Sequence, residues 1–257
     1  MNDQSGQPAP PPLTVLELPA RVDRGEILRY AGMPGAGRGQ LSLRLGVELE
    51  SAVTWLLSRA RPRGIYATHP ITLEHDLVTF HGTAAPLSLR SADLARLLDG
   101  SQTATILAVT AGSEVDDEVV RLSAAGKLAQ AAFLDAAGSD CVEQAADILC
   151  CMLGRSASRL GREVTERFSP GYGDLELAVQ PAVAAAAHAG RIGIQVQASL
   201  MMLPLKSVTA IVGSRPAKAD SRPGGPPGDT GDAKCARCQV RECRYRLDSD
   251  VEKVDQR

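Results

Sequence analysis

Aromatic residues are scarce in this chain: Phe, Trp and Tyr together make up 3% of its 257 residues. Proteins that stack bases or sugars on exposed rings depend on such side chains, so the composition argues against that kind of surface. Neither sign of charge dominates, because 28 Lys and Arg residues are balanced by 30 Asp and Glu residues. A general surface for nucleic acid or anionic membranes is therefore not indicated.

Long apolar runs are missing as well. No stretch reaches the roughly 18 uncharged apolar residues that a membrane span needs. Residues 1–12 are polar and rich in proline, with neither the basic start nor the apolar segment of a signal peptide. We therefore expect a cytoplasmic protein that does not associate with membranes and whose six cysteines are reduced thiols.

Hydrophobic residues make up 44% of the chain, enough for a sizeable core built from Ala, Leu and Val. Apolar periodicity predicts two long helices, one through 115–133 and a second through 142–160, with a capping box of Asp140 and Glu143 at the start of the second. Shorter helices and strands are predicted around them, the helices at 22–30, 40–59, 94–98 and 176–189 and the strands at 13–18, 65–67, 77–80, 105–110, 192–196 and 207–212. Helices flanked by separate strand pairs favour an α+β fold, with long helices packed on a mixed or antiparallel sheet.

The composition changes along the chain and predicts four segments. The first is a disordered leader and the second a single folded domain. A flexible linker rich in Pro and Gly follows, and a flexible cysteine-containing tail ends the chain. The boundaries that we predict for these segments are 1–12, 13–213, 214–233 and 234–257.

Residues 167–174, with the sequence Arg-Phe-Ser-Pro-Gly-Tyr-Gly-Asp, concentrate several side chains of special chemistry. The guanidinium of Arg167 offers a planar fork of donors suited to a carboxylate. Gly171 and Gly173 leave room for a ligand against the backbone, and Tyr172 supplies a hydroxyl and a ring face. The alternative interpretation is a tight turn beside a solvated arginine.

A second segment, residues 199–213, reads Ser-Leu-Met-Met-Leu-Pro-Leu-Lys-Ser-Val-Thr-Ala-Ile-Val-Gly. On its own it predicts a buried strand entered through a proline turn, with methionines as core filler. Taken together, the two segments resemble the activation domain of cobalamin-dependent methionine synthase, and more closely the short stand-alone proteins similar to that domain. The resemblance spans roughly residues 13–213 and includes three further stretches, at 26–30, 108–112 and 134–139.

The resemblance implies a reactivation function. Such domains bind S-adenosylmethionine and present its methyl group to the cobalt. The methyl transfer consumes the cob(I)alamin that forms by one-electron reduction of the inactive cob(II)alamin state, and so draws that reduction forward. By residue-to-residue matching, Arg167 would clamp the α-carboxylate of the ligand, and the backbone at Ser169 and Gly171 would contact its polar groups. Tyr172 matches the family's tyrosine beside the ligand, which implies a catalytic role in steering the reacting end.

The acid that should accompany the sulfonium is not identified by the motifs. The family often has Thr-Glu-Ser where this chain has Gln197-Ala-Ser199, and four acids remain as candidates: Glu143, Asp147, Glu163 and Glu166. The Asp-x-His-x-x-Gly motif of cobalamin-binding proteins does not occur in the chain. The resemblance therefore implies that cobalamin arrives on a partner, a methionine synthase without its own activation domain, and that a separate electron donor acts with them.

Three cysteines lie close together near the end of the chain: Cys235, Cys238 and Cys243. Two residues between thiols is a spacing that lets both sulfurs face one metal. The three thiolates could hold zinc with a fourth ligand from elsewhere, or an Fe–S cluster with one borrowed site. The alternative is a tail of unliganded thiols. For the whole protein the alternatives are a non-catalytic metal-binding module acting on a corrinoid protein, or a reactivator of another corrinoid methyltransferase.

Overall fold

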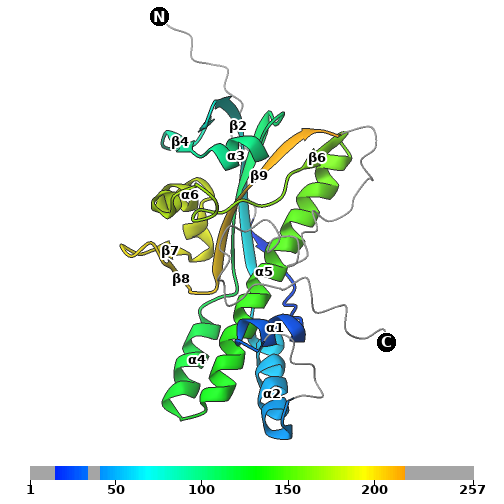
Figure 1. The fold of residues 1–257 in the computed structure, drawn as a ribbon, viewed down its shortest axis with the longest axis vertical. Coiled ribbons are helices and arrows are strands. Elements are labelled where there is room, and N and C mark those ends of the chain that lie inside the picture. The colour runs from blue at the N-terminus through cyan, green and yellow to red at the C-terminus, as the bar shows by residue number, and fades with distance from the viewer. Residues whose placement is uncertain (1–14, 34–40, 218–257) are drawn as a thin grey trace, which may run out of the picture.

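The computed structural model of the protein describes residues 15–33 and 41–217. The predicted leader, most of the predicted linker and the cysteine tail with Cys235, Cys238 and Cys243 lie outside these ranges. The described residues form an α+β fold in which helices cover both faces of an antiparallel sheet (Figure 1).

The main sheet has seven strands in the order β4-β3-β2-β5-β9-β6, with β1 beside β2, and every described pairing is antiparallel. Every residue from Ala104 to Thr110 of the central strand β5 is buried, as the run of β-branched and apolar residues predicts. A small separate sheet pairs β7 with β8. The strands are β1 (Leu16–Glu17), β2 (Arg63–Glu74), β3 (Leu77–Phe80), β4 (Leu87–Arg90), β5 (Thr103–Thr110), β6 (Arg162–Val164), β7 (Gln195–Val196), β8 (Met202–Leu203) and β9 (Ser207–Pro216).

Side chains that alternate along β5 divide the interior into two cores. Leu107 and Val109 belong to the first core, between the sheet and the layer of α1, α2, α4 and α5. Ile106 and Ala108 belong to the second core, on the opposite face, which α3 and α6 cover (Figure 1). The helices are α1 (Arg24–Tyr30), α2 (Leu43–Arg59), α3 (Ala92–Leu97), α4 (Glu114–Ala124), α5 (Leu128–Ser158) and α6 (Gln180–Ala186), with 3-10 turns at Leu177–Val179 and Ala189–Ile192.

The prediction of two long helices divided near residue 140 is wrong. The break lies at Gly126, which has a φ of +73° and follows the end of α4. The Gly126 N–H donates to the Ser123 oxygen at 3.1 Å and the Lys127 N–H to the Leu122 oxygen at 3.0 Å, a Schellman arrangement that ends the helix. The 31-residue helix α5 then runs without interruption through Asp140, which is buried and starts no helix.

The strand predicted at 192–196 begins only at Gln195, because residues 189–192 form a 3-10 turn. Strands β2 and β9 are longer than predicted, because each serves two partners. Strand β2 pairs with β5 through residues 63–70 and with β3 through residues 71–74, so it is longer than its apolar stretch suggests. Strand β9 continues to Pro216, three residues into the predicted linker, because residues 214–216 pair with β6. Within the described ranges, no helix combines the length and apolar character needed to cross a membrane.

Candidate functional site

The segment that leads to Arg167 runs alongside β9 as extended chain. Phe168 and Ile211 exchange two backbone hydrogen bonds, of 2.9 and 2.8 Å, and the Thr165 N–H donates to the Gly213 oxygen at 3.0 Å. Successive side chains of an extended segment point to opposite faces. Arg167 therefore points to the α5 side of the sheet, while Phe168 packs against the second core.

Arg167 lies against two carboxylates of α5. Its Nη2 is 3.0 Å from Oε2 of Glu143 and 2.5 Å from Oδ1 of Asp147, and its side chain is 9% exposed. The two acids are four residues apart, so they share one face of the helix. Burial opposes the charge of the guanidinium, but the acids outweigh it and raise the pKa of Arg167 above its ordinary value. Glu163, another candidate, instead pairs with Arg215 at 2.7 Å.

This arrangement suits a ligand that carries both signs of charge. A carboxylate of the ligand can take the place of Asp147 on the guanidinium, because the Asp147 side chain is 52% exposed and can turn into water at low cost. The displaced carboxylate and Glu143 are then available to a cationic group of the same ligand. Arg167 is not the solvated arginine of the alternative interpretation.

The loop after Arg167 is a closed turn. The Tyr172 N–H donates to the Ser169 oxygen at 3.1 Å, and the Gly171 N–H donates to the Leu175 oxygen at 2.8 Å. Gly171 has a φ of +89°, a conformation that favours glycine. The Tyr172 side chain is 53% exposed and meets the edge of Phe168, with ring centroids 6.4 Å apart. The turn expected as an alternative is thus present, and it holds an exposed phenol at the surface.

Asp174 fastens the far end of this loop to helix α3. Its carboxylate accepts hydrogen bonds from the Ser91 hydroxyl, from the Ala92 N–H at 2.7 Å and from the Asp93 N–H at 3.2 Å. The Ser91 hydrogen bond contributes most to lowering the pKa of Asp174. A carboxylate at the first turn of a helix satisfies unpaired N–H groups and complements the helix dipole. The final residue of the motif therefore has an anchoring function.

Replacing Asp174 with alanine should lower the free energy of unfolding by about 1–2 kcal/mol, because the first turn of α3 loses its carboxylate partner. Urea denaturation measures the change. The matched control is Asp76→Ala, which removes a carboxylate paired with an exposed arginine, Arg90, and should cost less than about 0.5 kcal/mol. Equal losses in the two variants would contradict the anchoring function.

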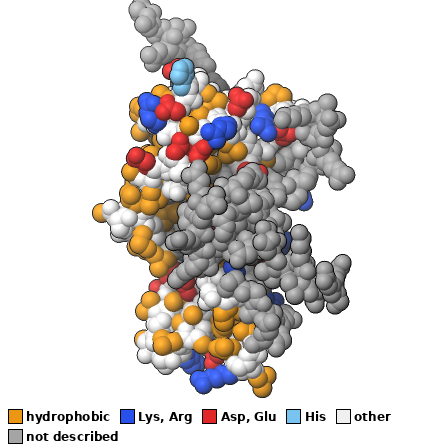
Figure 2. All heavy atoms as spheres, in the orientation of Figure 1, with side chains coloured by type: hydrophobic (Ala, Val, Ile, Leu, Met, Phe, Trp, Pro, Cys, Tyr) orange, Lys and Arg blue, Asp and Glu red, His pale blue; other side chains and the backbone are white. Residues whose placement is uncertain are grey.

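The second motif is bound to α5 through Lys206. Its Nζ lies 2.7 Å from Oδ1 of Asp135 and 3.1 Å from the Ser139 hydroxyl. Gly138 makes room for the lysine stem, because a Cβ there would lie 3.0 Å from Cγ of Lys206. Three hydrophobic side chains of the turn around β8 are exposed: Met201, Leu203 and Leu205. Figure 2 shows hydrophobic side chains gathered over this region. The methionine at position 201 is therefore not core filler.

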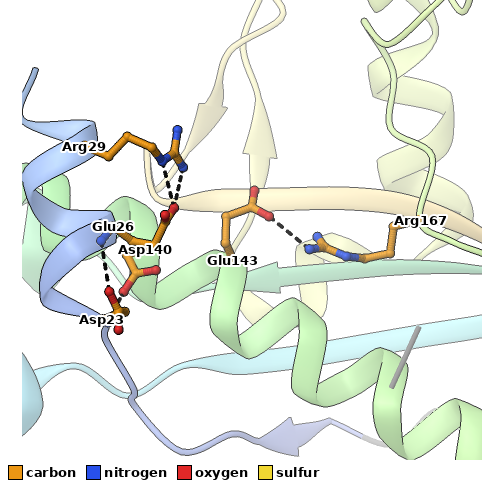
Figure 3. Close-up of polar contacts among 6 residues, drawn as sticks. All are labelled: Asp23, Glu26, Arg29, Asp140, Glu143 and Arg167. Atoms are coloured by element: carbon orange, nitrogen blue, oxygen red, sulfur yellow. Dashed lines mark hydrogen bonds and ion pairs between the residues drawn. The ribbon is translucent and has the colours of Figure 1, made fainter. Parts of the chain in front are cut away.

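Helix α1 lies against the part of α5 that carries Asp140 and Glu143 (Figure 3). The Arg29 guanidinium pairs with Glu26 at 2.5 Å and lies 4.3 Å from the centre of the Tyr30 ring. Burial raises the pKa of Tyr30 to about 12, with a further contribution from the charge of Glu143. Sequence reasoning did not find these residues as site components, because no spacing rule connects position 30 with position 143.

The predicted metal ligands lie outside the described residues, so the structure does not place them. Among residues 15–33 and 41–217, no group of three or more His, Cys, Asp or Glu side chains is arranged to hold a metal ion. Cys141 and Cys150 are buried in α5, and burial raises the pKa of the Cys141 thiol to about 11. These thiols pack as small apolar side chains.

The fold of the described residues is similar to that of a protein whose structure has been solved. No family model matches the chain, and no curated protein matches it. Among solved structures, the crystal structure of the MetH reactivation domain bound to AdoHcy matches with a TM-score of 0.62 at 15% sequence identity. The match covers 86% of this chain and 84% of that one. The protein therefore has the fold of that reactivation domain.

Proposed function

We propose that the protein binds S-adenosylmethionine and supports the reductive methylation of cob(II)alamin on a partner methionine synthase that lacks an activation domain. The observation that carries this proposal is the nearly buried Arg167 between Glu143 and Asp147. It occurs in a fold shared with a reactivation domain that was crystallised with AdoHcy. The motifs at 167–174 and 199–213 support the same function through their resemblance to that family.

The charges of the ligand match the site. S-adenosylmethionine carries a carboxylate, an ammonium group and a sulfonium. Arg167 binds the carboxylate as a planar fork, while Glu143 and Asp147 bind the ammonium group. The main chain of Ser169 and Gly171 is proposed to contact the ligand through groups other than the Ser169 oxygen and the Gly171 N–H, which the turn uses. The exposure of Tyr172 supports an encounter with a partner protein.

The proposed reaction has two balanced steps. A one-electron donor reduces cob(II)alamin to cob(I)alamin on the partner. The cobalt of cob(I)alamin then takes the methyl group from the sulfonium, leaving S-adenosylhomocysteine and methylcobalamin. The protein contributes binding and orientation, and the Tyr172 hydroxyl steers the reacting end.

Calorimetry with S-adenosylmethionine and S-adenosylhomocysteine tests the first half of the proposal, and the cobalamin spectrum of a cobalamin-loaded methionine synthase with a one-electron reductant tests the second. We expect binding of both ligands and formation of methylcobalamin. Tyr172→Phe should bind normally but form methylcobalamin about 100-fold more slowly. If the wild type binds neither ligand, the proposal is wrong and the metal-binding module becomes the better interpretation.

The cysteine tail is proposed to hold zinc or an Fe–S cluster through Cys235, Cys238 and Cys243. Iron, sulfide and zinc analysis of anaerobically purified protein should find near-stoichiometric metal. The variant with serine at all three positions should contain none. Metal-free wild-type protein would leave the tail as a segment of unliganded thiols.

A further inference from the structure

Asp140 is a buried carboxylate in the middle of α5, where it is 2% exposed. Its Oδ2 accepts the main-chain N–H of Asp23 at 2.6 Å, and Gln144 donates a side-chain hydrogen bond to it. Burying a carboxylate is costly unless hydrogen bonds compensate. Asp140 has no part in the proposed methyl transfer. Its function is therefore sought in the segment that it binds, which begins at Asp23.

Asp23 is the N-cap of helix α1, and its Oδ1 accepts the Glu26 N–H at 3.0 Å. The helix has seven residues. Helices this short do not persist alone in water, so the position of α1 depends on its contacts with the rest of the protein. Ile27 and Leu28 bury its inner face in the first core, and Asp140 binds its N-terminal end.

The other end of α1 reaches the candidate site. Arg29 lies over the ring of Tyr30, and Tyr30 interacts electrostatically with Glu143, which pairs with Arg167 at 3.0 Å. Figure 3 shows Asp140 and Glu143 projecting from the same helix, with α1 alongside. Helix α1 is thus held by Asp140 at one end, and at its other end Tyr30 feels the charge of the carboxylate that binds Arg167.

We propose that Asp140 is a positioning residue: by holding the N-terminal end of α1 it places Arg29 and Tyr30 beside Glu143, and α1 forms one wall of the ligand site. This inference rests on the proposed function, because the ligand of that site is S-adenosylmethionine. Asp140 itself does not touch the ligand. Its effect on binding passes through the position of α1.

The charges around Asp140 make this anchor sensitive to pH. Burial, with smaller contributions from the charges of Glu26 in α1 and of its N-cap Asp23, raises the pKa of Asp140 to about 7. The hydrogen bonds from the Asp23 N–H and from Gln144 act in the opposite direction. The neighbouring thiol of Cys141, on α5, has its own pKa raised to about 11 and stays neutral. Release of α1 admits water to the carboxylate, so the docked state binds one more proton than the released state between about pH 4 and 7. Raising the pH through this range therefore favours release, by up to about tenfold per pH unit.

Hydrogen exchange of the α1 amides tests the anchor without any ligand. After correction for intrinsic exchange rates, wild-type protection should fall by up to about tenfold per pH unit between roughly pH 5 and 7 and then level off. Asp140→Asn keeps an acceptor but cannot ionise, so its α1 protection should not change with pH. Asp117→Asn, which changes an exposed aspartate of α4, is the control and should behave like the wild type. Wild-type-like pH dependence in Asp140→Asn overturns the proposal.

Ligand affinity tests the positioning. Across the same pH range Asp140→Asn should bind S-adenosylmethionine with a constant affinity, while the wild type weakens as the pH rises. Asp140→Leu, which offers no acceptor, should bind at least about tenfold more weakly, because the buried hydrogen bond to the Asp23 N–H is lost. If the wild type binds no ligand, the proposed function fails. The anchor is then judged separately, and wild-type-like pH dependence of α1 exchange in Asp140→Asn decides against it. If the wild type binds and both variants match it at every pH, the inference alone is wrong.

Discussion

Arg167→Ala is expected to weaken S-adenosylmethionine binding by at least about 100-fold, the loss of a bidentate charged contact. It should also lower the free energy of unfolding by about 2–3 kcal/mol. The variant leaves Glu143 and Asp147 one helical turn apart without the cation between them, and Glu143 is only 28% exposed. The exposure of Asp147 keeps this loss below that of a fully buried pair. Calorimetry and urea denaturation measure the two effects.

Arg215→Ala provides the matched control. Arg215 also pairs with a glutamate, Glu163, at 2.7 Å, and lies near the end of β9, where that strand pairs with β6. Arg215→Ala should lower the free energy of unfolding by about 1 kcal/mol or less and leave ligand affinity unchanged. Arg167→Lys should recover most of the stability but little of the affinity, because an ammonium group lacks the planar fork. Normal binding by Arg167→Ala would remove the central support for the proposed function.

Gly213→Ala is expected to cost about 3 kcal/mol of folding free energy. A Cβ at position 213 would lie 2.6 Å from Oγ of Ser101, 2.7 Å from Cδ2 of Leu98 and 3.0 Å from Cγ2 of Thr165. Thr165 accepts the Gly213 N–H at 2.8 Å and begins the segment that carries Arg167. Displacement of Thr165 should therefore reduce ligand binding together with stability. Thermal unfolding and calorimetry on the same preparation measure both.

Gly46→Ala, in contrast, should raise the free energy of unfolding. Gly46 lies within helix α2, and a Cβ there would meet nothing within 4 Å apart from its chain neighbours and the backbone of its own helix. Replacing a glycine inside a helix with alanine stabilises by about 0.5–1 kcal/mol when space is available. If Gly213→Ala were as stable as Gly46→Ala, the close packing of Thr165 against β9 would be refuted.

Local patterns predicted most of the fold, because each depends on residues that are near neighbours in sequence. The buried strand β5 and the Pro181 start of α6 are of this kind. The division between α4 and α5 differs from the predicted one because Gly126 fits both a helix interior and a helix end, and only its left-handed φ decides. The extension of β9 to Pro216 could not be predicted, since it depends on the pairing partner β6.

In the candidate site, too, the sequence predicts features that depend on neighbouring residues and misses those that depend on distant contacts. Residues of the loop at 167–174 could be named because they adjoin in sequence, and Glu143 and Asp147 were candidates among four acids. Which acids contact Arg167 depends on how α5 crosses the sheet. The spacing of the acids along the sequence does not determine it. The contributions of Arg29 and Asp140 depend on contacts across more than one hundred residues, such as the bond from Asp23 to Asp140.

The position of β9 has a consequence for biosynthesis. This strand is the last one in the described chain, yet it lies between β5 and β6, and Phe168 is held to it through Ile211. A nascent chain that has released its first two hundred residues from the ribosome still lacks the support on which Arg167 rests. The candidate site can therefore be assembled only after β9 has emerged. Translation products that end before β9 should carry the motif at 167–174 without the strand that supports Arg167.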